Sequence, residues 1–329
     1  MKQPGKPSDM SVLVTGGTGF IGSHIVDALV AANASVRVLD NFSTGSPQNL
    51  AHHKSGIEVL RADLSEPGVA EKACINVDTI FHFAAIPSVP RSIVDPVVTQ
   101  RNGELATVLL LQAAAQKKVR RLILASSCSV YGANERLPIS ENCTPHPISP
   151  YAASKLACEG YLTAFSQCHE IDTIALRYFN VFGPRQDASS SYAGVISIFL
   201  ARMLAGETPK VFGDGEQTRD FVFVQDAAAA ALLAMHSPKR FDGVAVNIGS
   251  GQRYSLNQLV ETLNVVLGTS IKPTYGRARD GDIRHSRADV AAAHELLGYR
   301  PKTSLHDGLC QYLEWSKAAG TTVEHLYRA

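Results

Sequence analysis

Short apolar runs alternate with longer amphipathic stretches over the first 180 residues of the chain. The apolar runs do not alternate strictly with polar residues, which is typical of strands covered on both faces of a parallel sheet. The pattern predicts strands at Ser11–Thr15, Ser35–Asp40, Ile57–Arg61, Asp78–Phe83, Arg121–Ser126 and Asp172–Arg177, with helices between them at Ile21–Ala32, Val97–Lys117 and Tyr151–His169. This order predicts βαβ units and an α/β fold with a doubly wound parallel sheet.

The alternation of short apolar runs and longer amphipathic stretches ends at about residue 180, and beyond it loops are longer and glycine and proline are clustered. We therefore predict a sheet domain over residues 1–180, with residues 1–10 as a flexible tail, and a smaller C-terminal lobe over 181–329. Elements at about 220–250, including a strand at Asp220–Val224, are expected to return to the first domain. Ligands of such sheets bind at the carboxyl ends of the strands, so we expect a cleft between the two parts.

The amino-acid composition argues against several classes of function. Lys and Arg total 31 against 30 Asp and Glu, a net charge of +1, which argues against nucleic-acid binding and polybasic membrane binding. The six cysteines form no CxxC pair, and Cys143 with His146 is a lone CxxH, so no metal is predicted. The first ten residues lack an apolar signal region, and the longest apolar run, 227–235, is too short for a bilayer. We expect a cytoplasmic protein.

A glycine-rich loop follows the first predicted strand directly. Gly16, Gly19 and Gly22 stand three residues apart, between that strand and an amphipathic helix. Glycine lets the backbone turn tightly and approach a pyrophosphate, whose charge is stabilised at a helix N-terminus. Phe20 and Ile21 would begin that helix. This placement predicts a dinucleotide-binding loop in a Rossmann-type sheet.

Acidic residues after the next two strands indicate which dinucleotide binds. Asp40 ends the second strand, where its carboxylate can accept hydrogen bonds from an adenosine ribose. It would repel a 2′-phosphate, and Asn41–Gly45 offers no arginine for one, so NAD is predicted over NADP. Asp63 and Leu64 follow the third strand, where they would meet the adenine ring. Asp63 would also suit a helix N-cap.

Tyr151 and Lys155 form the clearest catalytic pattern. Ser149 and Pro150 are suited to the N-cap and first position of a helix, which places Tyr151 in the first turn with Lys155 on the same face. A free tyrosine titrates near pH 10, and a lysine with a cationic nicotinamide can lower that pKa by about three units for roughly 4 kcal/mol. Ser127, in the cluster after the fifth strand, could hydrogen-bond a substrate oxygen.

These motifs resemble those of the extended short-chain dehydrogenase/reductase family, specifically its nucleotide-sugar 4-epimerases, over nearly the whole chain. The similarity lies in TGGTGFIG, FHFAAIPSVPRS, SSCSVYG, SPYAASK, LRYFNVFGPRQD, GDGEQTRDFVFVQDAA, VNIGSGQ and RDGDIRHSRAD. The resemblance implies Tyr151 as the base, Lys155 as the group that lowers its pKa, and Ser127 as the catalytic hydroxyl. The NAD-binding set it implies is Gly16, Gly19, Phe20, Ile21, Gly22, Asp40, Asn41, Ser43, Gly45, Asp63, Leu64, Phe83, Ala84, Ala85, Tyr151, Lys155 and Tyr178.

The resemblance also implies a UDP-sugar site. Asn180 would hydrogen-bond the diphosphate, and Arg219 and Arg279 would clamp it, because guanidinium groups pair with phosphates through two bonds. Asp282 would bind the uridine ribose. The full substrate set implied is Ser88, Arg91, Ser127, Asn180, Val195, Arg219, Arg279, Asp282 and Ser286. The family further implies a homodimer through Val97–Lys117 and Tyr151–His169.

Within the family, the residues after Ser127 favour epimerisation. Dehydratases and decarboxylases carry carboxylates there, whereas this chain has Cys128 and Ser129. The family's gatekeeper position holds Ser286, whose small side chain leaves room for a 2-acetamido group. The prediction is NAD-dependent 4-epimerisation of UDP-GlcNAc and UDP-GalNAc, with UDP-glucose and UDP-galactose also accepted. The alternatives are a UDP-GlcNAc uronate or UDP-glucuronate 4-epimerase, which Asp187 disfavours, a dehydratase or decarboxylase, and a non-catalytic NAD-binding regulator.

Overall fold

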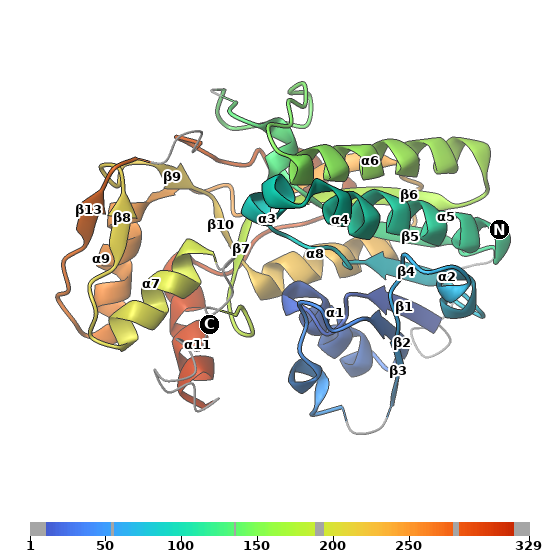
Figure 1. Ribbon diagram of the computed structural model, residues 1–329, viewed down its shortest axis with the longest axis horizontal. Coiled ribbons are helices and arrows are strands. Elements are labelled where there is room, and N and C mark those ends of the chain that lie inside the picture. The colour runs from blue at the N-terminus through green and yellow to red at the C-terminus, as the bar shows by residue number, and fades with distance from the viewer. Residues whose placement is uncertain (1–10, 54–55, 135, 188–193, 279–282, 319–329) are drawn as a thin grey trace.

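The computed structural model describes residues 11–53, 56–134, 136–187, 194–278 and 283–318, and its centre is a seven-stranded parallel sheet (Figure 1). The strand order is β11-β6-β5-β4-β1-β2-β3, and every neighbouring pair is parallel. The strands are β1 Ser11–Thr15, β2 Ser35–Asp40, β3 Ile57–Arg61, β4 Thr79–His82, β5 Arg121–Ser127, β6 Asp172–Tyr178 and β11 Val244–Ile248. The predicted α/β doubly wound sheet is confirmed. The order reverses between β1 and β4, which is where such sheets bind their ligands.

Helices cover both faces of the sheet, as the unbroken apolar strands require (Figure 1). One face packs against α1 Phe20–Ala31, α8 Val224–His236 and α10 Ala291–Leu297. The other face packs against α2 Val69–Ala73, α5 Ala106–Gln116 and α6 Pro150–Cys168. Two separate apolar cores result, and they leave the carboxyl ends of the strands as the edge at which polar groups collect.

The helix predicted over Val97–Lys117 is interrupted, which corrects the sequence-based expectation. It consists of α4 Pro96–Gln100, a π-helical turn at Arg101–Leu105, and α5. This turn packs against α6. A Cβ atom at Gly103 would lie 2.2 Å from the Ser154 Oγ, so a larger residue there would displace that hydroxyl. The π turn also directs Asn102 toward the cavity described below.

The remaining elements form a smaller layer beside the sheet, at the left of Figure 1. Its core contains Phe182, Phe199, Phe223, Leu259 and Tyr312 among other apolar side chains. The elements are β7 Asn180–Phe182, α7 Val195–Leu204, β8 Lys210–Phe212, β9 Thr218–Arg219, β10 Phe221–Phe223, β12 Tyr254–Ser255, α9 Leu256–Leu267, β13 Thr274–Gly276 and α11 Leu305–Ala318. The strand expected at Asp220–Val224 is the shorter β10, because Val224 already begins α8. α8 packs on α1, and β11 pairs with β6 in the main sheet.

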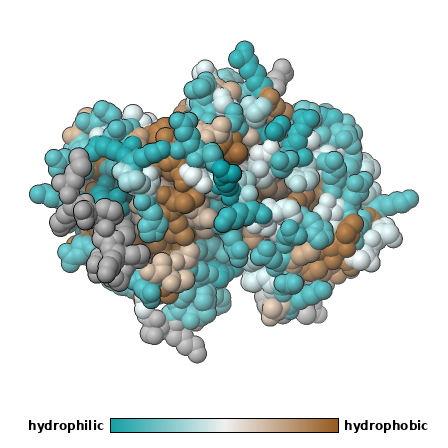
Figure 2. Space-filling view, turned by 180° about the vertical axis from the view of Figure 1, so that it is seen from behind, coloured by the Kyte–Doolittle hydropathy of each residue, from teal (hydrophilic) through white to brown (hydrophobic). Residues whose placement is uncertain are grey.

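None of the helices among the described residues is long and apolar enough to cross a bilayer. Seen from behind, the molecule is mostly hydrophilic, and its hydrophobic side chains lie in separate patches (Figure 2).

Candidate active site

A cavity of about 790 Å³ lies at the carboxyl ends of the central strands. Because parallel strands end at one edge, residues far apart in the sequence meet there. The following predicted residues line it: Gly16, Gly19, Phe20, Ile21, Gly22, Asp40, Asn41, Ser43, Gly45, Asp63, Leu64, Phe83, Ala84, Ala85, Arg91, Ser127, Tyr151, Lys155, Tyr178 and Asn180. Thus the structure brings together all of the predicted cofactor residues and the three predicted catalytic residues.

The glycine loop is shaped to receive an anion. Gly16 has a φ of +69°, and a Cβ there would lie 2.6 Å from the backbone nitrogen of Ala84. A Cβ at Gly22 would lie 2.2 Å from the carbonyl oxygen of Gly16, so side chains are excluded at both positions. The first turn of α1 has no side-chain cap and no acidic residue. Its N–H groups therefore remain available for a pyrophosphate, as NAD requires.

Two carboxylates stand at the far end of the same cavity. The Asp40 carboxylate is held by the backbone N–H groups of Thr18 (3.0 Å) and Phe42 (2.8 Å). Asp63 accepts hydrogen bonds from Ser65 and from the Asn41 amide. Burial tends to raise the pKa of Asp63, but these hydrogen bonds outweigh it and lower the pKa below its usual value. Both fixed carboxylates are well placed to accept hydrogen bonds from an adenosine moiety.

The predicted catalytic helix has the local structure its sequence requires. The Ser149 Oγ accepts a hydrogen bond from the Ala152 N–H (3.2 Å), and Pro150 occupies the first turn, so the predicted N-cap is confirmed. Tyr151 and Lys155 lie one turn apart at the start of α6. The Lys155 Nζ is 6.0 Å from the centre of the Tyr151 ring and donates a hydrogen bond to the carbonyl oxygen of Ala125 (2.7 Å).

Burial governs the protonation of this pair in the structure. It raises the pKa of Tyr151 to about 12, although a hydrogen bond with Ser127 acts in the opposite direction. It also lowers the pKa of Lys155. The sequence predicts a lowered tyrosine pKa, whereas in the structure the ammonium is directed to the Ala125 carbonyl and burial disfavours the phenolate. Positive charge from a bound group would lower the pKa of Tyr151 in the predicted direction.

Cys128 occupies the position where dehydratases of the resembled family carry a carboxylate. Burial raises the pKa of its thiol to about 12, so the thiol stays protonated at neutral pH. The neighbouring Ser129 hydroxyl is buried without a hydrogen-bond partner. Neither side chain is a carboxylate, and a thiol that holds its proton is not a base at pH 7.

Several predicted substrate residues lie away from the cavity lining. Ser88 is buried as the N-cap of α3 Val89–Val94, where its Oγ accepts the Arg91 N–H. Val195 begins α7, next to Gly194 of the lining. Arg219 lies in β9, and the backbone N–H of buried Ser286 donates to the Thr218 carbonyl in the same strand (3.1 Å). Arg279 and Asp282 lie outside the described residues.

Part of the cavity lining was not predicted. Gln186 is the most informative case, because its Oε1 is buried without a partner while its Nε2 donates to the Val181 carbonyl (3.2 Å). A signal was present for Gln186 and for several others, since they belong to the motifs that carry the resemblance. Leu39, Thr44 and Ala62 lie outside those motifs, and only folding brings them to the edge. The lining residues not predicted are Leu39, Thr44, Ala62, Ile86, Pro87, Asn102, Ala106, Ala125, Ser126, Phe179, Val181, Gln186, Asp187 and Gly194.

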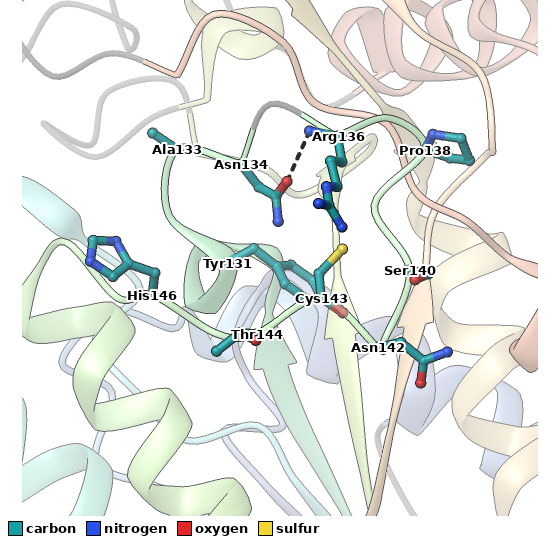
Figure 3. Close-up of a pocket in the computed structure, with 10 residues that line it drawn as sticks. All are labelled: Tyr131, Ala133, Asn134, Arg136, Pro138, Ser140, Asn142, Cys143, Thr144 and His146. Carbon is teal, nitrogen blue, oxygen red and sulfur yellow. Dashed lines mark hydrogen bonds between the residues drawn. The ribbon is translucent and has the colours of Figure 1, made fainter.

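A second cavity, of about 700 Å³, lies beside the loop over residues 131–146. Arg136 and Cys143 point toward each other in it, whereas His146 is directed elsewhere, so the CxxH pair does not converge (Figure 3). Among the described residues, one group of side chains could reach a common metal ion: Asp27, His52 and His53. Both imidazoles already lie within hydrogen-bonding distance of the Asp27 Oδ1, and Arg185 binds its Oδ2 (2.6 Å).

The comparison with known families agrees with this geometry. Residues 12–249 match the model of the NAD dependent epimerase/dehydratase family. The chain belongs to this family. The glycine loop, the acidic residues at the cavity edge and the Tyr151–Lys155 helix all lie in the matched part, and NAD is the cofactor.

Relatives with the same architecture act on nucleotide sugars. The UDP-glucose 4-epimerase of Mycolicibacterium smegmatis is 38% identical over 310 residues, covering 93% of this chain and 98% of that protein. A UDP-N-acetylglucosamine 4-epimerase from Methanobrevibacter ruminantium, solved with UDP-N-acetylmuramic acid, has a TM-score of 0.90 at 38% identity, with 94% and 99% coverage. A UDP-glucuronic acid 4-epimerase from Bacillus cereus, with NAD and a fluorinated substrate analogue, has a TM-score of 0.87 at 31% identity, with 94% and 100% coverage.

Proposed function

We propose that the protein is an NAD-dependent 4-epimerase of a UDP-hexose. The observation that carries the proposal is the convergence of Tyr151, Lys155 and Ser127 on the cavity that also contains the glycine loop. 4-Epimerases of UDP-sugars match the chain at nearly full length, both in sequence and in structure. Cys128 and Ser129 place no carboxylate directly after Ser127, which disfavours dehydration and decarboxylation.

The chain's own residues would move one proton. Tyr151 takes the proton of the sugar 4-hydroxyl, Ser127 hydrogen-bonds the same oxygen, and Lys155 keeps positive charge beside the phenolate. When bound, NAD supplies the hydride acceptor and a positively charged ring. The 4-keto sugar would then turn about its diphosphate, C4 would receive the hydride back on its opposite face, and Tyr151 would return the proton to the 4-oxygen. Asn180, Arg219, Arg279 and Asp282 would hold the UDP part meanwhile.

We favour UDP-GlcNAc and UDP-GalNAc as the substrate pair, with UDP-glucose and UDP-galactose also accepted. Ser286 is small and buried, so a 2-acetamido group would meet little obstruction if the sugar reaches this residue. A uronic sugar is the competing choice, because an epimerase of UDP-glucuronic acid is among the similar structures. NMR of the protein with UDP-GlcNAc, UDP-glucose and UDP-GlcNAc uronate in turn would separate these choices.

Tyr151→Phe tests the function itself. Removing the phenolic oxygen should reduce kcat by about 10²- to 10⁴-fold, the usual contribution of a general base. NAD content, measured after denaturing the purified protein, should stay at the wild-type level, because the glycine loop is intact. A Tyr151→Phe variant of undiminished turnover would contradict the assignment, and wild-type protein without turnover on any of the sugars would favour a regulator.

We also propose a homodimer formed through α3, α4 and α6. Ile93, Val94 and Val97 are 64%, 86% and 73% exposed, and Tyr161 on α6 is 42% exposed. Both α3 and α4 pack against α6, and the three helices lie together at the top of Figure 1. A second copy would cover them in a two-fold interface. Light scattering of wild-type protein should give twice the chain mass, and Val94→Glu with Val97→Lys should give the monomer.

A further inference from the structure

A buried ion pair stands directly behind the catalytic side chains. Glu159 and Arg177 are each 6% exposed, and the Arg177 Nη2 lies 2.6 Å from the Glu159 Oε2. The Arg177 Nε donates to the same carboxylate. The other carboxylate oxygen accepts the hydroxyl of Ser126, which lines the cavity immediately before Ser127. The ion pair is therefore joined by one hydrogen bond to the wall of the active site.

The pair continues as a hydrogen-bonded chain away from the cavity. The Arg177 Nη1 donates to the Tyr131 hydroxyl (2.8 Å), and that hydroxyl donates to the Asn247 Oδ1 (2.7 Å). Tyr131 is 1% exposed and Asn247 is fully buried. Because each group has a fixed partner on both sides, small rotations of one member would break bonds of the next. The network ties β5, β6, β11 and α6 together at the catalytic edge.

Two successive turns of α6 bind the end of β5. The Lys155 Nζ donates to the carbonyl oxygen of Ala125, and Glu159, one turn further, accepts the hydroxyl of Ser126. The next residue of the strand is Ser127. The three residues Tyr151, Lys155 and Glu159 are spaced by four along the helix and so share one face. α6 is therefore hydrogen-bonded to β5 at Ala125 and Ser126, the two residues that precede Ser127.

We propose that Glu159 is a positioning residue: with Arg177 it fixes the end of β5 that carries Ser127 against the catalytic face of α6. This inference rests on the proposed function, since it takes Ser127 as catalytic. A site of this kind must hold its reacting groups to within a fraction of an ångström, and rigid neighbours supply that constraint.

Charge gives Glu159 a second effect on the same site. Lys155 is buried, which lowers its pKa, and the thiol of Cys158 and the carboxylate of Glu159 both act to raise it again. The other titratable groups around this position are Tyr151 on the same helix, His82 on β4 and Glu104 near Cys158. Arg177 and Tyr131 belong to the network, and Glu141 lies beside it. Burial and Lys155 lower the pKa of His82 to about 3, so His82 is neutral and Arg177 is the second cation. Glu159 is the carboxylate that offsets Lys155 and Arg177 together.

Glu159→Gln tests the inference, because it keeps the shape of the side chain and removes its charge. The expected result is a kcat about 10- to 100-fold lower, with KM little changed, since the UDP-binding residues lie elsewhere. The alkaline limb of the kcat profile should also begin at lower pH, because Lys155 loses the carboxylate that keeps it protonated. The matched control is Asp172→Asn, which breaks an equally buried arginine pair at the opposite ends of β5 and β6.

The outcomes separate this inference from the proposed function. Wild-type protein without UDP-sugar turnover would refute the function. Wild-type turnover with Glu159→Gln matching Asp172→Asn in both kcat and pH profile would overturn the positioning role. Should Glu159→Gln fail to fold, Ser126→Ala removes only the bridging hydroxyl and is expected to lower kcat several-fold at constant KM. Unchanged kinetics in Ser126→Ala would then overturn the inference.

Discussion

The sheet contains two buried arginine–carboxylate pairs, one at each end of β5 and β6. At the amino ends Arg121 faces Asp172, and at the carboxyl ends Arg177 faces Glu159. The side chains of both pairs are less than one tenth exposed. Their partners differ. The Arg121 guanidinium donates to the carbonyl oxygens of Ala234, Ser237 and Lys239 at the end of α8, all of them backbone groups.

The catalytic-end pair binds side chains instead, and one of them, Ser126, belongs to the cavity wall. Burial and charge alone therefore do not distinguish a structural ion pair from one that serves a site. What distinguishes them is whether the network reaches a reacting group. The amino-end pair fixes the end of a helix and the start of β11, whereas the carboxyl-end pair fixes the strand beside Ser127.

The largest effect on stability is expected from Asp172→Asn. Breaking a buried pair leaves Arg121 without its counter-charge, which typically costs about 3–5 kcal/mol. The variant also weakens the bond from the Phe241 N–H to the Asp172 Oδ1 (2.7 Å). Urea denaturation at pH 7 should show this loss, while kcat at a temperature where the variant is folded stays at the wild-type value. If kcat fell as much as in Glu159→Gln, the two ion pairs would not differ in function, which would contradict a purely structural role for the Arg121–Asp172 pair.

Features that depend on neighbouring residues could be predicted from the sequence, whereas those that depend on contacts between distant residues could not. Six strands of the main sheet, the glycine loop and the Ser149 cap depend on residues close in the chain, and they were predicted nearly to the residue, whereas the seventh strand, β11, was not predicted. In the π turn Gly103 meets Ser154, 51 positions away, whereas the local pattern predicts a continuous helix there. Glu159 and Arg177 read as an ordinary helix position and an ordinary strand position, because their pairing exists only after α6 packs on the sheet.

His82, at the catalytic end of β4, has a buried imidazole. It lies within hydrogen-bonding distance of Thr15 (2.7 Å) and Thr107 (3.0 Å), and burial lowers its pKa from 6.5 to about 3. In the unfolded chain the imidazole gains a proton as the pH falls through 6.5, whereas in the folded protein it stays neutral. Stability is therefore complete above pH 6.5 and declines between 6.5 and 3, by about 3 kcal/mol at pH 4.

His82→Asn removes this titration. The free energy of unfolding, measured in urea at pH 7, 5.5 and 4.5, should fall less steeply with acid in the variant than in the wild type. The variant is expected to be less stable at pH 7 because a buried side chain is lost, so the slope is the quantity to compare. Parallel slopes would show that His82 takes up its proton in the folded state.

The smallest expected effect concerns the helix caps, and it again contrasts a catalytic position with a structural one. Ser149 caps α6 just before Tyr151, and Ser255 caps α9 through a reciprocal pair of bonds with Gln258. Each serine→alanine variant should lose about 1 kcal/mol of stability, the usual contribution of such a cap. Only Ser149→Ala should also lower kcat, by a few-fold, because the freed first turn carries the phenol. Thermal melts and initial rates on the two variants, measured side by side, would check this, and an equal loss of kcat in Ser255→Ala would contradict it.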